Sequence, residues 1–436
     1  MEWYYALAFL IFMVIGLMFF AVPVAFAFMV TNIIGSLVFI GGSGALLQVV
    51  DNSTSLITRF QLAPVPFFIL MGSLFFYSGL AVRVFDTLDA FFGRIPGRLC
   101  YLTVAGGTIF STLTGSSMAN TAMLGSLMVP EMQRRGYHWR MTLGPILGTG
   151  GLAMIIPPST LGVLLASLAG LDVGRFLIAG IIPGFMLASF FAVLIFVQIR
   201  LNPALTPHYE VEEIPWRRGI YLAFVNILPM ALVVFMVIGL IIGGIATPTE
   251  SAAFGVVGVF ILTIAFRLLS IDVIKQSVLA TIKVSGMVFF IILNSSIFSQ
   301  LLAYSGASSG MLDFATSFEV SPALVLVLMF ISLLILGMFM DPVSIMLITI
   351  PIFFPLINAL GIEPLWFGIL MLIALEMSQT TPPFGLLLFV MLGVAPKGTT
   401  LRQVALAAAP FLGCDLVLIG LMALFPGIVL FLPGLM

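Results

Sequence analysis

Charged side chains are scarce in this sequence. Lys, Arg, Asp and Glu make up 8% of the 436 residues, whereas 61% are hydrophobic and the mean hydropathy is +1.27. A water-soluble protein needs far more polar surface, and apolar runs of roughly 18 or more residues recur at the length that spans a bilayer. The composition therefore predicts an all-α polytopic membrane protein, because helices satisfy their own backbone groups in lipid.

Residues suited to catalysis or to transition metals are also few. The two cysteines, Cys100 and Cys414, lack metal-ligand spacing, and His138 and His208 are the only histidines. The sequence has no HExxH, P-loop or GxSxG motif. A net charge of −1 and the lack of a basic tail argue against nucleic acid as a partner. We therefore expect no enzyme, no transition metal and no organic cofactor.

Apolar segments fall into two similar sets on either side of a polar connector, residues 200–219. The first set lies at roughly 3–22, 23–43, 62–80, 99–114, 118–130, 143–170 and 176–199. The second set lies at roughly 220–245, 248–266, 285–303, 321–339, 343–360, 364–395 and 403–431. This pattern predicts two repeats, 1–199 and 220–436, joined by a cytoplasmic connector.

The two halves echo each other at an offset of 225 residues. Ser116 and the pair Pro157-Pro158 correspond to Asp341 and the pair Pro382-Pro383, and Pro23 corresponds to Pro248. A proline that interrupts a helix costs about 3 kcal/mol. The repetition of such breaks predicts a duplicated unit whose broken helices serve a purpose.

Each half is expected to contain one hairpin and one broken helix. Residues 99–130 turn at 114–117 and leave arms of about 15 residues, short of the roughly 20 that a crossing requires. Residues 143–170 are interrupted at Pro157-Pro158. Segments 321–360 and 364–395 repeat both features. The interpretation is a re-entrant helical hairpin and two half-helices in each repeat.

The hairpins leave about five crossings in each half, and an odd number inverts the second repeat relative to the first. Of the 16 Lys and Arg residues, all except Arg59 and Arg175 then fall on one side, which the positive-inside rule makes cytoplasmic. Both termini are predicted on the opposite side. If both hairpins instead cross the membrane fully, the segments after the second hairpin lie on the same sides as before. The charges therefore determine the orientation of the chain better than they determine the depth of the hairpins.

Two amphipathic connections are expected to lie along the membrane surface. In residues 267–283, Ile271, Ile274 and Val278 share a face opposite Lys275. Residues 51–61 hold the corresponding place in the first half. A plain connecting loop is the alternative.

Polar residues gather at the first hairpin tip: Thr112, Thr114, Ser116, Ser117, Asn120 and Thr121. Hydroxyl, amide and freed carbonyl oxygens are hard donors suited to a small cation. The alternative is that these hydroxyls only satisfy helix ends and pack closely. The clustering beside a repeated break favours ion or substrate binding.

Three acids require separate interpretations. A carboxylate at membrane depth costs at least about 2.5–3.5 kcal/mol, so Asp341 needs a partner such as a cation, and it also suits the N-cap of the helix that Pro342 begins. Glu376 could bind a proton or ion, or pair with a buried polar group. Glu250 fits a capping box with Thr247, and we favour that structural role.

The proline breaks also suit an anion. Half-helices that begin near Pro157-Pro158 and Pro382-Pro383 would present free N–H groups and positive dipole ends. No Lys or Arg lies in these apolar segments. An anionic substrate would therefore be held by dipoles, hydroxyls and cations that bind with it.

At these residues the chain resembles the large membrane (M) subunit of tripartite ATP-independent periplasmic (TRAP) transporters and, more distantly, other elevator proteins of the ion transporter superfamily. The resemblance covers essentially the full length, and its most specific pieces are 115–120, 246–250 and 381–385. It implies sodium-coupled import of an organic acid, such as a C4-dicarboxylate or sialic acid, across the bacterial inner membrane, with periplasmic termini.

The resemblance also implies an elevator domain, partners and sites. Residues 99–170 and 321–395 would form the transport domain, and the rest would form a scaffold that holds a small four-helix (Q-type) subunit. A periplasmic (P-type) substrate-binding protein would deliver the substrate. The implied sodium ligands are Ser116, Ser117, Asn120, Gly150, Pro157, Gly337, Asp341, Thr380 and Thr381. The implied substrate contacts are Ser117, Ser159, Thr160, Thr381 and Gly385.

Two other functions remain open. One is a stand-alone transporter coupled to protons or sodium, in which Asp341 and Glu376 carry protons. The other is an intramembrane enzyme that uses the same two acids, although the sequence shows no nucleophile–base or metal-ligand pattern. One difference between the repeats also matters: the second tip carries Asp341 where the first carries the neutral Ser116. The two ion sites should therefore differ chemically.

Overall fold

The protein is helical throughout the part that the computed structural model describes, which is residues 2–20, 22–41, 62–91, 95–207, 220–310, 313, 321–383 and 385–436. The first half contains α1 (Trp3–Phe19), α2 (Val24–Phe39), α4 (Pro64–Tyr77), α5 (Leu80–Phe91), α6 (Arg98–Thr114), α7 (Ser117–Arg134), α8 (Trp139–Gly151), η2 (Leu152–Met154), α9 (Thr160–Ala169), α10 (Val173–Ala179), α11 (Ile181–Leu201) and η3 (Pro203–Leu205).

The second half begins with the π-helix η4 (Ala223–Ile227). It continues with α13 (Leu228–Ile242), α14 (Pro248–Ala265), α15 (Ile271–Tyr304), α17 (Pro322–Gly337), α18 (Pro342–Ala359), α19 (Pro364–Thr380), α20 (Leu386–Val394), α21 (Leu401–Leu424), α22 (Gly427–Leu430) and η5 (Pro433–Leu435).

Within the described residues, six helical stretches are long and apolar enough to cross a bilayer: Val173–Leu201, Ile220–Ile242, Pro248–Ala265, Ile271–Tyr304, Pro342–Ala359 and Leu401–Leu424. Shorter apolar helices accompany them, α1, α2 and α4 among them. The predicted class, an all-α membrane protein, is confirmed. Proline at the first helical position begins α14, α17 and α18, where its missing N–H leaves no hydrogen bond unmade.

The expected segments match the helices closely, with two differences. Helix α5 corresponds to none of the expected apolar segments. The amphipathic residues from Ile271 onward belong to α15, a single 34-residue helix about 51 Å long, instead of a separate surface segment. Residues 51–61 and most of the connector, 208–219, lie outside the described residues; before them the chain ends α11 and forms η3.

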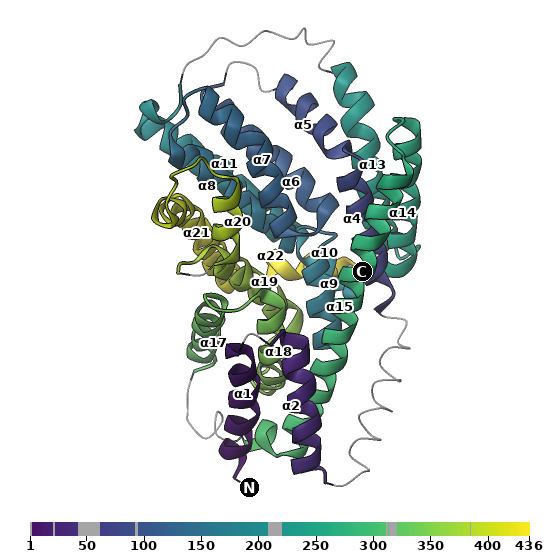
Figure 1. The fold of residues 1–436 in the computed structure, drawn as a ribbon, viewed down its shortest axis with the longest axis vertical. Helices are drawn as coiled ribbons and strands as arrows, with labels where there is room; N and C mark the ends of the chain where they lie inside the picture. Colours follow the sequence, from purple (N-terminus) through teal and green to yellow (C-terminus); the bar gives the residue numbers. More distant parts are fainter. Residues whose placement is uncertain are drawn as a thin grey trace.

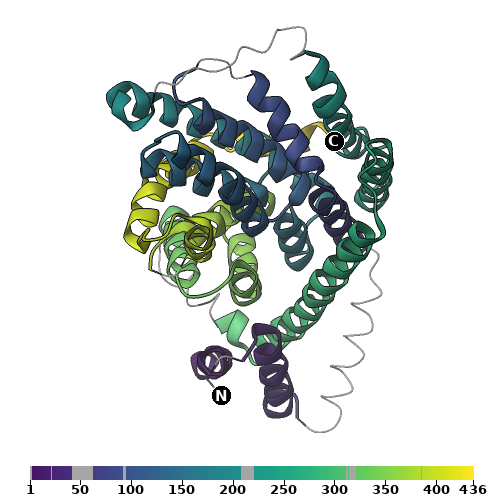
Figure 2. The ribbon, with the colours of Figure 1, turned by 45° about the horizontal axis from the view of Figure 1, so that its top comes forward.

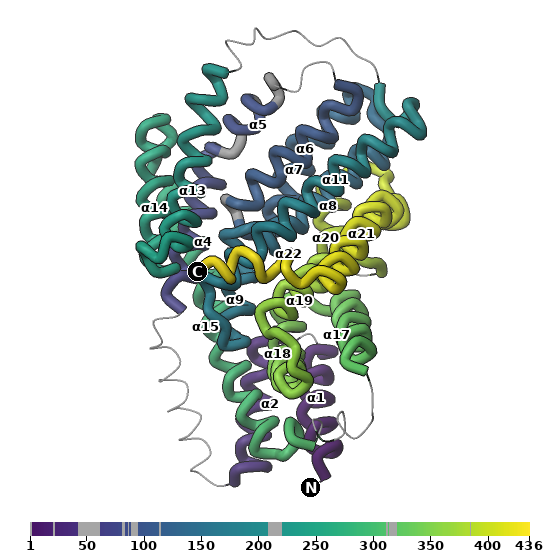
Figure 3. The backbone as a smooth tube through the Cα atoms, turned by 180° about the vertical axis from the view of Figure 1, so that it is seen from behind, coloured from purple at the N-terminus to yellow at the C-terminus, as the bar shows by residue number. Residues whose placement is uncertain are grey.

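The long helix α15 runs along one side of the molecule (Figure 1, Figure 2). It packs against α2 near one end and against α4, and α14 also packs on α4. Helices α1 and α13 complete the two ends, on α2 and α14 respectively. On the other side, α6–α11 and α17–α22 form a second body, across which α21 and α22 run toward the C-terminus (Figure 3).

Contacts in the two halves correspond. The pairs α2–α15 and α14–α4 are related by the 225-residue offset, as are α6–α8 and α17–α19. Gln379 donates a hydrogen bond of 3.6 Å to the sulfur of Met154, and these two residues are 225 apart. A residue that touches its own counterpart lies where a two-fold axis would pass. This supports the predicted duplication, which stays a prediction together with the inversion and the division into transport domain and scaffold.

Close helix packing holds the second body together. A Cβ atom added to Gly148 of α8 would lie 2.5 Å from the ring of Phe411 on α21, and one added to Gly144 would lie 2.7 Å from the same ring. Small residues let helix backbones approach in this way. Helix α21, like α11, therefore packs on α8, although the sequence assigned both to the scaffold.

Replacing Gly148 by Leu should destabilise the protein by about 1–3 kcal/mol, because the side chain would overfill the α8–α21 contact. Thermal unfolding of the purified protein in detergent would show a lower midpoint. Gly420→Leu on α21 is the matched control, since a Cβ there meets nothing within 4 Å. Equal midpoints for the two variants would contradict this packing.

Candidate functional site

The first hairpin turns at Gly115, whose φ of +59° suits a residue without a side chain. The Ser116 hydroxyl then caps α7 by accepting a hydrogen bond of 3.4 Å from the Ala119 N–H. A Cβ on Gly115 would lie 2.9 Å from both the Pro158 carbonyl oxygen and the Thr160 hydroxyl. The first tip thus rests directly on the break of the first interrupted helix.

That break separates α8 from α9. After Gly151 the chain forms η2 and then the cis-linked pair Pro157-Pro158. The Ser159 hydroxyl caps α9 by accepting from the Gly162 N–H at 2.9 Å, and it donates to the Met154 carbonyl. Both hydrogen bonds of the Ser159 hydroxyl are made within the chain, and Ser159 is 1% exposed. The next residue, Thr160, is partly exposed and lines the cavity described below.

Three side-chain oxygens behind this tip are buried and lack a hydrogen-bond partner among the described residues: Ser117 Oγ, Asn120 Oδ1 and Thr121 Oγ1. Their residues are 3%, 0% and 0% exposed. Gly150 lies against Thr121, because a Cβ there would overlap the Thr121 hydroxyl. Such groups are costly to leave unpaired in an apolar interior, and their spacing of i, i+3 and i+4 puts all three on one face of α7, where they can accept a cation.

The amide of Asn120 is held in a defined orientation. Its Nδ2 donates to the Ser111 hydroxyl at 3.0 Å and to the carbonyls of Thr149 and Gly107 at 3.2 and 3.4 Å. These bonds tie α7 to α6 and α8 and leave the amide oxygen as the free acceptor.

The second tip is built differently. Asp341 caps α18 by accepting from the N–H groups of Val343 and Ser344 at 3.0 and 3.1 Å, and it also accepts from the Ser344 hydroxyl. The predicted cap is therefore present. Gly337, at the end of α17, lies directly against the Ser378 side chain on α19. This tip also meets its interrupted helix.

The second break follows Thr380. The hydroxyls of Thr380 and Thr381 donate to the Met377 carbonyl at 3.1 and 2.7 Å. Gly385 folds back so that a Cβ there would lie 2.8 Å from the Thr381 carbonyl oxygen. The hydroxyl protons are used within the helix, which leaves only oxygen lone pairs for a ligand.

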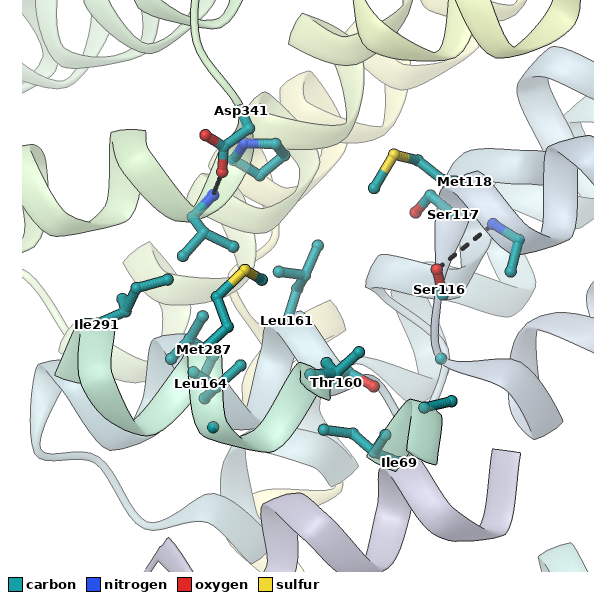
Figure 4. A pocket seen from close by; sticks show the side chains of 18 of the residues that line it. Ile69, Ser116, Ser117, Met118, Thr160, Leu161, Leu164, Met287, Ile291 and Asp341 are labelled. Atoms are coloured by element: carbon teal, nitrogen blue, oxygen red, sulfur yellow. Dashed lines mark hydrogen bonds between the residues drawn. The ribbon is translucent and has the colours of Figure 1, made fainter. Parts of the chain in front are cut away.

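A cavity of about 960 Å³ separates the two tips from α15. Ser116, Ser117 and Met118 lie on one side of the cavity, and Asp341 lies on another side together with Met287 of α15 (Figure 4). Within the described lining, Asp341 is the only residue with a charged side chain. Helices α7 and α9 begin here, at Ser117 and Thr160, so their positive dipole ends lie beside the cavity.

The predicted site residues separate into three groups. Ser116, Ser117, Thr160 and Asp341 line the cavity. Asn120 and Gly150 lie behind the first tip, and Gly337, Thr380 and Thr381 lie at the second. Ser159 and Gly385 are folded into the breaks and are not part of the described lining, and Pro157 lines a small apolar void with Phe68 and Val237.

The sequence analysis missed two polar residues, one in the cavity lining and one in the interior away from it. Gln379 lines the cavity, and its place opposite Met154 in the 225-residue offset could have drawn attention to it. Asp415, buried on α21, is an acid in an apolar helix, a signal that the sequence did contain. The predicted capping box is confirmed, since Glu250 accepts from the Thr247 N–H at 2.8 Å.

Comparison with known proteins adds a family to this geometry. Residues 11–428 match the family described as the DctM component of the tripartite ATP-independent periplasmic transporter. The chain is 34% identical to the C4-dicarboxylate TRAP transporter large permease protein DctM of Pseudomonas aeruginosa, over 86% of this chain and 87% of that one. It is 26% identical to the sialic acid TRAP transporter large permease protein SiaM of Vibrio cholerae, over 97% of each.

A solved structure has a similar fold. The YdaH transporter of Alcanivorax borkumensis superimposes with a TM-score of 0.59 and 14% identity, over 89% of this chain and 90% of that one. At this identity the likeness concerns the fold alone.

Gly115→Ala should destabilise the protein more than Gly136→Ala. Both glycines have positive φ, +59° and +81°, so each substitution carries the left-handed backbone cost of about 1–2 kcal/mol. Only at Gly115 would the new methyl group press on Pro158 and Thr160. Thermal unfolding midpoints should rank wild type above Gly136→Ala and Gly136→Ala above Gly115→Ala. An equal loss in both variants would show that the tip does not rest on the break.

Proposed function

Because this chain belongs to the family of the DctM component of tripartite ATP-independent periplasmic transporters, we propose that it imports an organic acid driven by a sodium gradient. Its relatives are transporter permeases and not enzymes. The family implies a tripartite system with a substrate-binding protein and a small subunit. In our proposal these are a periplasmic binding protein and a four-helix membrane subunit, and the complex lies in the bacterial inner membrane with both termini of this chain periplasmic.

The observation that carries sodium coupling is the set of three unpartnered oxygens behind the first tip. Ser117 Oγ, Asn120 Oδ1 and Thr121 Oγ1 are neutral, hard and buried. A monovalent cation satisfies such oxygens without bringing a second full charge into the membrane. The backbone near Gly150 and Pro157, where the helix is interrupted, would complete the first sodium site.

A second sodium is proposed between the second tip and its break. Gly337 and Asp341 would contribute from the tip, and the oxygens of Thr380 and Thr381 from the break. Asp341 already accepts three hydrogen bonds, so it would act as a charged neighbour with remaining lone pairs. This site would therefore respond differently from the first one to loss of its ligands.

The organic acid is proposed to bind in the cavity between the tips and α15. Ser117 and Thr160, at the starts of α7 and α9, would receive its carboxylate. The relatives that transport C4-dicarboxylates and sialic acid support an organic acid as the substrate class. The body that contains both tips and both breaks would move relative to α15 as an elevator.

Sodium should stabilise the protein against heat, and Thr121→Val should weaken this effect. We expect the loss of one oxygen ligand of a cation to cost about as much as the loss of a hydrogen bond to a charged group, which is about 1.5–3 kcal/mol. This corresponds to about tenfold to a hundredfold in sodium affinity. The measurement is the unfolding midpoint in detergent as sodium replaces choline at constant ionic strength. Thr103→Val is the matched control, because Thr103 is buried and its hydroxyl donates to the Leu99 carbonyl at 2.8 Å. An equal sodium response in both variants would remove Thr121 from the site.

Asp341→Asn should weaken sodium-dependent uptake while the α18 cap survives in part, because the amide oxygen can still accept. Uptake would be measured in proteoliposomes that contain the permease, its small subunit and its binding protein. Full sodium dependence in the variant would contradict a ligand role for Asp341. Uptake without the binding protein that ignores sodium and collapses with a protonophore would instead indicate a stand-alone proton-coupled transporter.

A further inference from the structure

Two acids meet in the interior of the second body, away from the cavity. Glu376 on α19 and Asp415 on α21 are each 1% exposed. Their carboxyl groups lie within hydrogen-bonding reach of each other. Asp415 lies near the middle of α21 and Glu376 lies four residues before the end of α19, both in apolar sequence, so the pair is enclosed by protein.

Among the described residues, no Lys or Arg is placed to neutralise this pair. The ionisable groups of the described elements packed on α19 and α21 are His138, Arg140, Asp172, Arg175, Arg200, Asp341, Glu363, Lys397, Arg402 and the thiol of Cys414. Apart from Cys414, these lie near helix ends. Arg402, on the same helix as Asp415, is 13 residues away, about 20 Å along the axis. Arg140 and Arg200 lie over the rings of Trp139 and Phe196.

The backbone around Glu376 does not favour a negative charge either. Its Oε1 fills the space beside Gly151, where a Cβ would overlap it. Gly151 is the last residue of α8, and the C-terminal end of a helix carries partial negative charge. A carboxylate at this end is disfavoured, whereas a group that carries a proton is favoured.

The hydrogen-bonding inventory leads to the same result. Ionised carboxylates only accept hydrogen bonds, so two of them in contact lack a donor. One oxygen of each acid, Glu376 Oε2 and Asp415 Oδ1, is buried without a partner in the described structure. Two adjacent buried carboxyl groups cannot both ionise without large repulsion. A single proton between them removes the repulsion and supplies the donor.

We propose that Glu376 and Asp415 form a proton-binding site that holds one proton between their carboxyl groups. The site lies in the body that carries both tips, and it is separate from the sodium and substrate sites proposed above. With one proton shared, α19 and α21 can pack with these two side chains in contact, because the pair carries one negative charge instead of two.

Infrared spectroscopy of the full-length protein in detergent tests the site directly. The wild type at neutral pH should show the C=O stretch of a buried protonated carboxylic acid. Glu376→Gln and Asp415→Asn should each lose this band, because a side-chain amide can donate to the remaining carboxylate and no proton is needed. Glu250→Gln, which changes an acid in an exposed capping box, should keep it. Absence of the band in the wild type, or its survival in both pair variants, would overturn the proposal.

The pH dependence of stability gives an independent readout. A proton that is held only by the folded pair is released on unfolding, so the wild-type unfolding midpoint should fall as pH rises from acidic values, until the folded pair also loses its proton. The fall should be smaller in Glu376→Gln and in the double variant Glu376→Gln/Asp415→Asn, which stays informative if one single variant folds poorly. An equal fall in the wild type and the double variant would contradict the site.

Sodium must also be excluded as the occupant. The proton site predicts that Glu376→Gln retains the sodium-dependent stabilisation of the wild type, whatever the result for Thr121→Val. If Glu376→Gln instead abolishes that stabilisation, the pair binds sodium and the proton assignment is wrong. If sodium has no effect on any variant while the infrared band behaves as expected, the sodium proposal fails and the proton site stands.

Discussion

The close approach of each hairpin tip to an interrupted helix is the constraint on which the rest of the site depends. Gly115 reaches the Pro158 carbonyl and Thr160, and Gly337 reaches Ser378, because neither glycine has a side chain. In an apolar environment, backbone groups freed by a break must find partners within the protein. The tips therefore lie where helical hydrogen bonding is interrupted, and polar atoms gather at the same two places.

The two tips use this arrangement in chemically different ways. Behind the first, neutral oxygens of Ser117, Asn120 and Thr121 lack partners in the described structure, which favours a ligand that brings its own charge. At the second tip the acid is Asp341, and its carboxylate accepts hydrogen bonds from the backbone N–H groups of Val343 and Ser344 at the start of α18. An ancestral duplication followed by divergence at several positions, with Asp341 in place of Ser116 and Ile345 in place of Asn120, would produce this asymmetry. It would also give two coupling ions unequal affinities.

Charge is scarce in the apolar helices, and each acid there has a distinct environment. Asp341 is stabilised by backbone N–H groups at a helix start, where the dipole favours an anion. Glu376 lies at the opposite kind of helix end, beside Gly151, and meets a second acid. The two carboxyl groups therefore lie beside opposite kinds of helix end, a start with free N–H groups for Asp341 and an end with partial negative charge for Glu376.

Much of the architecture followed from the sequence alone. Hydropathy, the proline breaks, the capping box of Glu250 and the positions of the tips are local signals, so they placed nearly every helix and identified the family resemblance. Only the tertiary structure decided which polar atoms remain without partners and that Glu376 meets Asp415. Residues 376 and 415 lie on different helices, and the packing of glycines in α8 sets their approach. Apolar patterning records that a side chain is buried, but the partner of a buried polar group depends on long-range packing that local sequence does not encode.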